Sequence, residues 1–137
     1  MKLLQLSLFL CLSQLLFAQT TENGKKTVQP ALRFTVLEIE RQDIPYGSED
    51  LFVFEFKNTS KKAAVITNVQ TSCGCTAAER PETPIRKGKK GVIKVHYDTK
   101  RVGAFTKTIT VFSNVGDPIV LTIKGTVLTP SDSPVTN

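Results

Sequence analysis

Tryptophan is absent from this sequence of 137 residues, and histidine occurs once, as His96. Antibody-type domains pack a buried tryptophan against a disulfide that joins two distant strands. Here Cys73 and Cys75 are separated by a single residue, and no widely spaced cysteine pair could bridge two sheets. The sequence therefore excludes the antibody-type signature and predicts a core of aliphatic and phenylalanine side chains.

Catalytic motifs are also missing. The sequence has no Gly-x-Ser-x-Gly nucleophile elbow, no phosphate-binding glycine loop and no histidine placed with an obvious nucleophile. Acidic residues gather between positions 38 and 50, but without the spacing of a calcium-binding loop. We therefore predict that the protein is not an enzyme and carries no cofactor.

The one long apolar run covers residues 3–17, which is shorter than the roughly 20 residues that a membrane-spanning helix needs. Lys2 precedes this run, and Ala18 after it is small enough for a cleavage site. This arrangement is typical of a secretory signal peptide at residues 1–18. Acylation of Cys11 is a weaker alternative because a bulky residue precedes it. We therefore expect an exported protein, periplasmic or secreted, without a transmembrane segment after cleavage.

The rest of the sequence divides into three parts by composition. Residues 19–30 are polar and lack periodicity, which predicts a linker. Residues 129–137 are rich in proline, serine and aspartate, which predicts a disordered tail. Residues 31–128 between them have the length of one domain. The formal net charge of the whole chain is +6, a basic balance that favours solubility and weak attraction to anionic surfaces.

Short runs rich in β-branched and aromatic residues alternate with turn signals throughout this domain. Phe52, Phe54 and Phe56 fall on one face by the two-residue period of a strand, so we expect them in the core. About seven strands are expected, at residues 32–39, 51–57, 63–70, 75–79, 92–98, 105–112 and 119–127. This number and pattern predict an all-β, immunoglobulin-like sandwich of antiparallel strands.

Several short motifs occur in a fixed order along this domain: Ser-Cys-Gly-Cys-Thr at residues 72–76, glycine turns at Gly88 and Gly91, and Leu-x-Ile-x-Gly ending at Gly125. Over about residues 32–128 this series resembles a family of secreted bacterial proteins known as domain of unknown function 1573. The family tends to carry Asp-Phe-Gly before its second strand, where this chain has Asp-Ile-Pro-Tyr-Gly at residues 43–47. The resemblance implies an immunoglobulin-like β-sandwich, similar to modules of cilia- and sperm-associated proteins, without an established molecular activity.

Cys73-Gly74-Cys75 places two thiols one residue apart. Residues i and i+2 of a strand point to the same side with Cα atoms about 6.5 Å apart, near the upper limit for a disulfide, and Gly74 lets the backbone bend. Three alternatives are open: a local disulfide or buried thiols without further role, a redox-exchange pair, and a metal site. Zinc needs four ligands and Cys73, Cys75 and His96 supply three at most, so copper(I) is the better metal candidate.

Basic residues concentrate in the expected turns. If the strands are antiparallel, one end of the sandwich carries Lys61, Lys62, Arg86, Lys87, Lys89 and Lys90. Lys100 and Arg101 fall at the opposite end, near the cysteines. Lysines in turns keep strand edges soluble, and a basic patch also attracts an anionic partner or surface. Nucleic acid is not expected because no aromatic residues alternate with these charges.

These features together predict a function. The protein is expected to be an exported, non-enzymatic immunoglobulin-like module that binds or organises a partner in the cell envelope, a protein or another envelope component. The alternative is a thiol-dependent redox or copper-handling protein that uses Cys73-Gly74-Cys75. His96, next to Lys94 on the outward side of its strand, is expected to be a solvated residue.

Overall fold

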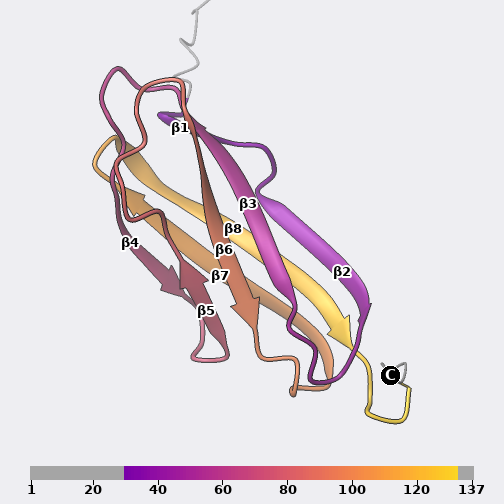
Figure 1. Ribbon diagram of the computed structural model, residues 1–137. Coiled ribbons are helices and arrows are strands. Elements are labelled where there is room, and N and C mark those ends of the chain that lie inside the picture. Colours follow the sequence, from indigo (N-terminus) through magenta and orange to yellow (C-terminus); the bar gives the residue numbers. More distant parts are fainter. Residues whose placement is uncertain (1–29, 133–137) are drawn as a thin grey trace, which may run out of the picture.

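The computed structural model describes residues 30–132, which form two β-sheets packed face to face (Figure 1). The expected signal peptide, the expected linker apart from Pro30, and residues 133–137 of the expected tail lie outside the described residues. The strands are β1 (Leu32–Phe34), β2 (Glu38–Ile44), β3 (Leu51–Asn58), β4 (Ile66–Thr71), β5 (Thr76–Glu79), β6 (Lys90–Tyr97), β7 (Gly103–Ser113) and β8 (Gly116–Val127). Among residues 30–132, no helix is long and apolar enough to cross a membrane.

Each sheet has four strands, in the order β1-β3-β6-β5 in the first and β2-β8-β7-β4 in the second. Neighbours in the first sheet are all antiparallel. In the second sheet β4, β7 and β8 are antiparallel, while β2 runs parallel to β8 with Ile39 opposite Ile123. The predicted immunoglobulin-like β-sandwich is confirmed, with this one parallel pair and with eight strands where about seven were expected.

The core forms between the inner faces of the two sheets, as the alternating pattern of the sequence predicts. Phe52, Phe54 and Phe56 on β3 are at most 1% exposed. Opposite them the second sheet contributes Ile109 and Leu121, both fully buried. Burial of this apolar surface is the main stabilising contribution in such a sandwich, since hydrophobic transfer amounts to about 25 cal/mol per Å².

The segment at residues 32–39 differs from the single strand that its composition predicts. β1 pairs with β3 in the first sheet, with Phe34 opposite Phe56. The chain then crosses at residues 35–37 to the second sheet, where β2 continues to Ile44. The crossing contains no glycine or proline, so the local sequence carries no signal for the break. Near the end of β2, Asp43 has a φ of 55°, and the pairing register shifts between Arg41 and Ile44.

The loops at the two ends of the sandwich bring together different residues (Figure 1). At the end drawn uppermost, the connection after β3 meets the connection after β5, where Ala64 and Ile85 form an antiparallel bridge. At the opposite end, the turn between β4 and β5 meets the loop after β6, where the Asp98 amide donates to the Cys75 carbonyl at 2.9 Å. The turns at residues 59–63 and 86–89 are therefore at the opposite end from the cysteines, whereas the turn with Lys100 and Arg101 is at the cysteine end.

Candidate functional site

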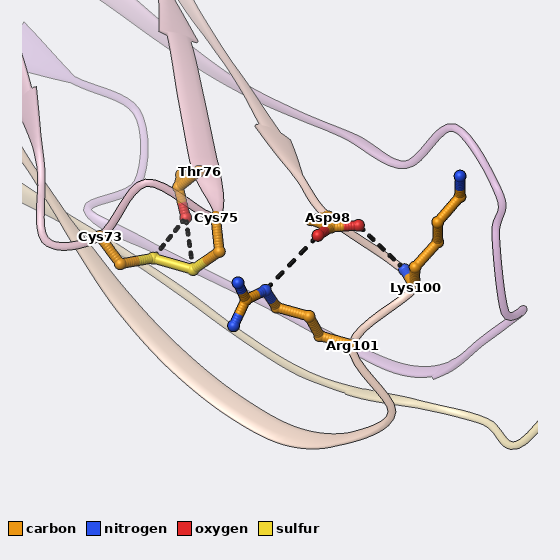
Figure 2. A network of polar contacts seen from close by, with 6 residues as sticks. All are labelled: Cys73, Cys75, Thr76, Asp98, Lys100 and Arg101. Carbon is orange, nitrogen blue, oxygen red and sulfur yellow. Dashed lines mark hydrogen bonds and ion pairs between the residues drawn. A yellow bond between two sulfur atoms is a disulfide. The ribbon is translucent and has the colours of Figure 1, made fainter.

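The turn between β4 and β5 contains a disulfide between Cys73 and Cys75 (Figure 2). Their Cα atoms are 5.3 Å apart, which is shorter than the spacing of an extended strand because the chain turns at Gly74. Cys75 is buried with 8% of its surface exposed, whereas Cys73 is half-buried. Of the alternatives for the two cysteines, the structure therefore shows the bonded pair.

The Thr76 side chain lies close to both sulfurs of this bond. Its hydroxyl lies 3.6 Å from the Sγ of Cys73 and 3.8 Å from the Sγ of Cys75. The residue is only 5% exposed, so few other partners are available to this hydroxyl. Sequence reasoning did not single out Thr76, although a threonine directly after the second cysteine is the signal that would have found it.

The loop after β6 supplies charged groups beside the disulfide turn (Figure 2). Arg101 Nε lies 3.4 Å from the Asp98 carboxylate, and the Lys100 amide donates to the same carboxylate at 3.2 Å. Figure 2 shows the Arg101 side chain pointing from its loop back toward the disulfide. A cation in this position favours a negatively charged sulfur over a neutral one.

Tyr97 and Phe105 form the apolar side of this end. Their rings stack with centroids 3.8 Å apart, and both residues are buried. Burial raises the pKa of the Tyr97 phenol, with the Arg101 charge lowering it and the Asp98 charge raising it. The phenol is therefore neutral at ordinary pH, and the stacked pair closes the core behind the disulfide turn.

The structure does not bring His96 together with the cysteines. His96 is on the outer face of the first sheet, where its Nε2 lies 3.2 Å from the Glu79 carboxylate. Cys75, by contrast, is buried in the core between the sheets. Within the described part of the chain, no group of three or more histidine, cysteine, aspartate or glutamate side chains could hold a metal ion.

At the basic end, Asn58 organises the loops that carry the cations. Its side chain is fully buried, and its Nδ2 donates to the carbonyls of Lys62 and Ile85, each at 2.8 Å. Its Oδ1 accepts from the Ser60 amide at 2.9 Å. The Asn58 carbonyl accepts from the Gly88 amide at 2.7 Å. One side chain thus joins the loop after β3 to the turn before β6. The sequence predicted only a turn here and did not indicate this role of Asn58.

The two loops carry the basic residues that the sequence grouped together. Lys90 forms an ion pair with Glu55 at 3.6 Å. No ion pair among residues 30–132 involves Lys61, Lys62, Arg86, Lys87 or Lys89. We call these five residues the basic end. Five uncompensated cations on two tethered loops make a region of positive potential.

Fold and site together define the class: an all-β, immunoglobulin-like sandwich with a disulfide at one end and a basic end opposite. The family model described as "Protein of unknown function (DUF1573)" matches residues 32–127, so the chain belongs to that family. The resemblance found in the sequence is thereby confirmed at the level of the family. No curated protein matches the sequence.

Solved structures share the fold at low sequence identity. A Porphyromonas gingivalis W83 protein of unknown function is 15% identical with a TM-score of 0.58, over 71% of this chain and 46% of that one. The Vibrio cholerae VesB protease is 12% identical with a TM-score of 0.56, over 70% and 32%. The ASH/PapD-like domain 7 of human CEP192 is 7% identical with a TM-score of 0.57, over 76% and 92%. This chain spans less than half of the two bacterial proteins, and the likenesses show the fold alone.

Proposed function

We propose that this protein is an exported, non-enzymatic β-sandwich module that binds an anionic component of the cell envelope through its basic end. The observation that carries this proposal is the tethering of two loops by Asn58, which places five cations without acidic partners on one end. By contrast, Lys90 and Lys94 on the first sheet's outer face form ion pairs with Glu55 and Glu79. A surface left uncompensated in this way suits a partner that brings its own negative charge.

The charge arrangement supports a partner with several anionic groups. Each exposed ion pair contributes little by itself, about 0 to 1 kcal/mol, so one phosphate or carboxylate would bind weakly. The five cations lie on two loops that are hydrogen-bonded to one another, so they act over one surface. A membrane leaflet with anionic headgroups presents matching charges at high density, and each nearby lysine or arginine contributes about 1 kcal/mol there.

Export is the other part of the proposal, and it rests on the sequence of residues 1–18, which the structure does not describe. The fold supports neither a catalytic nor a binding role by itself, because β-sandwiches carry many functions. Export would bring the basic end to the anionic surfaces of the envelope. Sequencing the N-terminus of the protein recovered from cell fractions tests this part. We expect the protein found outside the cytoplasm to begin at Gln19.

Co-sedimentation with vesicles tests the binding. We expect the protein to bind vesicles that contain phosphatidylglycerol and not to bind vesicles of phosphatidylcholine alone. Bound protein should dissociate at about 1 M salt, where the Debye length falls to about 3 Å. The double variant Lys61→Glu/Lys87→Glu should lose binding. The matched control, Lys94→Glu/Lys100→Glu, changes the net charge equally but away from the basic end and should retain it. Equal loss in both variants would show that only net charge matters and would contradict the proposal.

A further inference from the structure

The disulfide end carries a second function that is independent of the basic end. We infer that Cys73–Cys75 is a thiol–disulfide exchange site, which oxidises a pair of thiols on an exported partner protein. The structure holds the pair as a disulfide on a turn, with the two sulfurs in unequal surroundings, with a hydroxyl close to both sulfurs, and with the Arg101 side chain pointing toward the disulfide. These are the features that exchange chemistry requires.

The reaction takes place in two displacements. A thiolate of the partner attacks the Sγ of Cys73, a mixed disulfide forms, and the Cys73–Cys75 bond breaks with Cys75 leaving as a thiolate. The second thiolate of the partner then attacks the partner's own sulfur in the mixed disulfide and releases Cys73 as a thiolate. The partner is oxidised to a disulfide by two electrons, the cysteine pair is reduced to two thiols, and the two protons lost by the partner thiols balance those gained here.

Exposure decides which sulfur is attacked. Cys73 is half-buried, while Cys75 is 8% exposed and belongs to the core with Ala64 and Ile66. An incoming thiolate needs a clear approach along the sulfur–sulfur axis, and the more exposed residue provides it. Cys73 is therefore the attacked sulfur and Cys75 is the leaving group.

One group close to the Cys75 sulfur and one that points toward it would stabilise the leaving thiolate. The Thr76 hydroxyl, 3.8 Å from the Cys75 Sγ, can donate to a sulfur anion, which is a much stronger acceptor than a disulfide sulfur. The Arg101 side chain points toward the same turn and brings a positive charge, which Asp98 partly offsets. A better stabilised leaving thiolate leaves faster.

The turn does not depend on the disulfide for its position. The Ser72 amide donates to the Thr108 carbonyl at 3.0 Å, and the Asp98 amide donates to the Cys75 carbonyl at 2.9 Å. The Thr71 hydroxyl donates to the Cys73 carbonyl at 3.1 Å. A bond that closes so short a loop also removes little entropy from the unfolded chain. The two thiols therefore stay close together in the reduced protein, ready to be oxidised again.

Alkylation under native conditions tests the exchange directly. The mature protein is treated with dithiothreitol, the new thiols are counted by mass spectrometry, and far-ultraviolet circular dichroism records the fold. We expect two thiols per chain without a change in the spectrum, and restoration of the disulfide by oxidised glutathione. Reduction that occurs only in denaturant overturns the inference.

Variants beside the sulfurs test the assigned roles. Thr76→Val should slow reduction of the folded protein by about threefold to tenfold, the worth of one hydrogen bond, and Thr76→Ser should restore the rate. Arg101→Gln should slow it by about threefold, while Arg86→Gln at the other end makes the same charge change and should leave the rate unaltered. Equal rates in Thr76→Val and the parent protein overturn the role of the hydroxyl.

Single cysteine variants test the direction of attack. In Cys75→Ser the remaining Cys73 should form a mixed disulfide with oxidised glutathione at least about tenfold faster than the remaining Cys75 does in Cys73→Ser. Both variants lack the Cys73–Cys75 disulfide, so any loss of fold stability from its absence is common to both. The difference in rate therefore reports how accessible each sulfur is. Equal rates overturn the assignment of Cys73 as the attacked sulfur.

Discussion

The side-chain amide of Asn58 donates a 2.8 Å hydrogen bond to the backbone carbonyl of Ile85, 27 residues further along the chain. The same nitrogen donates to the carbonyl of Lys62. Two loops that carry cations of like sign repel one another, and this buried amide holds them together against that repulsion. The shape of the basic end is therefore set by an uncharged residue beneath it.

Replacing Asn58 by alanine should lower the free energy of unfolding by about 2 to 4 kcal/mol, because several backbone groups lose their partner in a buried place. Urea denaturation followed by circular dichroism measures the change. Asn68→Ala is the matched control: its side chain is exposed and accepts only from the neighbouring Val69 amide, so a change within about 0.5 kcal/mol is expected. A small effect at Asn58 would show that the loops are held by their backbone bonds alone.

Gly125 on β8 lies opposite Arg41 of the parallel strand β2. A Cβ atom at this position would be 2.5 Å from the Arg41 carbonyl oxygen and 2.9 Å from the Phe105 ring. The oxygen belongs to the backbone and cannot turn away, so Gly125→Ala should destabilise the fold by about 1 to 3 kcal/mol. Thermal unfolding measures this loss. Gly74→Ala, where no atom other than those of the two adjacent cysteines lies within 4 Å of the added methyl group, should leave the melting temperature nearly unchanged.

The disulfide should contribute little to stability for a bond of its kind. On the chain-entropy model, a loop of about three residues contributes about 1.6 kcal/mol, compared with 2 to 4 kcal/mol for most disulfides. Urea unfolding of the oxidised and reduced proteins should therefore differ by about 1 to 2 kcal/mol. A reduced protein that is unfolded without urea would contradict this expectation, and it would also remove the basis for a reduced state that functions.

Much of the fold could be predicted because the long strands β3, β6 and β8 alternate between buried and more exposed residues. The alternation of Phe52, Phe54 and Phe56 fixes which side of β3 faces the core, and the same pattern fixes Ile93 and Val95 on β6. The crossing at residues 35–37 could not be predicted in this way. β2 is mostly charged or polar, so its residues give little signal for a strand. Only its pairing with β8, distant in the sequence, separates it from β1, which pairs with β3.

At the disulfide end, too, local features could be predicted from the sequence more readily than contacts between distant segments. Cys73 and Cys75 are close in the sequence, so geometry alone indicated that a disulfide was feasible. The approach of Arg101 depends on the pairing of β5 with β6, where Thr76 lies opposite Tyr97. The long connection between these strands contains Pro81 and Pro84, and its path cannot be read from local patterns. The order of antiparallel strands therefore predicted that Lys100 and Arg101 lie at the same end as the cysteines, but not the individual contacts that Asp98 and Arg101 make there.

Tyr97 makes the stability of the fold sensitive to alkaline pH. Its pKa in the folded protein is raised above the ordinary value of 10.0, chiefly because the phenol is buried. In the unfolded chain the phenol loses its proton near pH 10, whereas in the folded protein it keeps the proton to higher pH. Between these two pKa values the unfolded state binds fewer protons, so the free energy of unfolding falls as pH rises. Below pH 10 both states are protonated and Tyr97 causes no pH dependence.

Tyr97→Phe tests this relation, because it keeps the ring that stacks on Phe105 and removes the titrating group. Urea unfolding is measured in steps from pH 8 upward for both proteins, so that the titration of lysines common to both cancels in the difference. The difference should be constant below about pH 10 and should then shift in favour of Tyr97→Phe as the pH rises further. Parallel curves at all pH values, or a shift that favours the parent protein, would mean that the phenol is solvated at this end of the sandwich and that the stacked rings do not seal the core behind the disulfide turn.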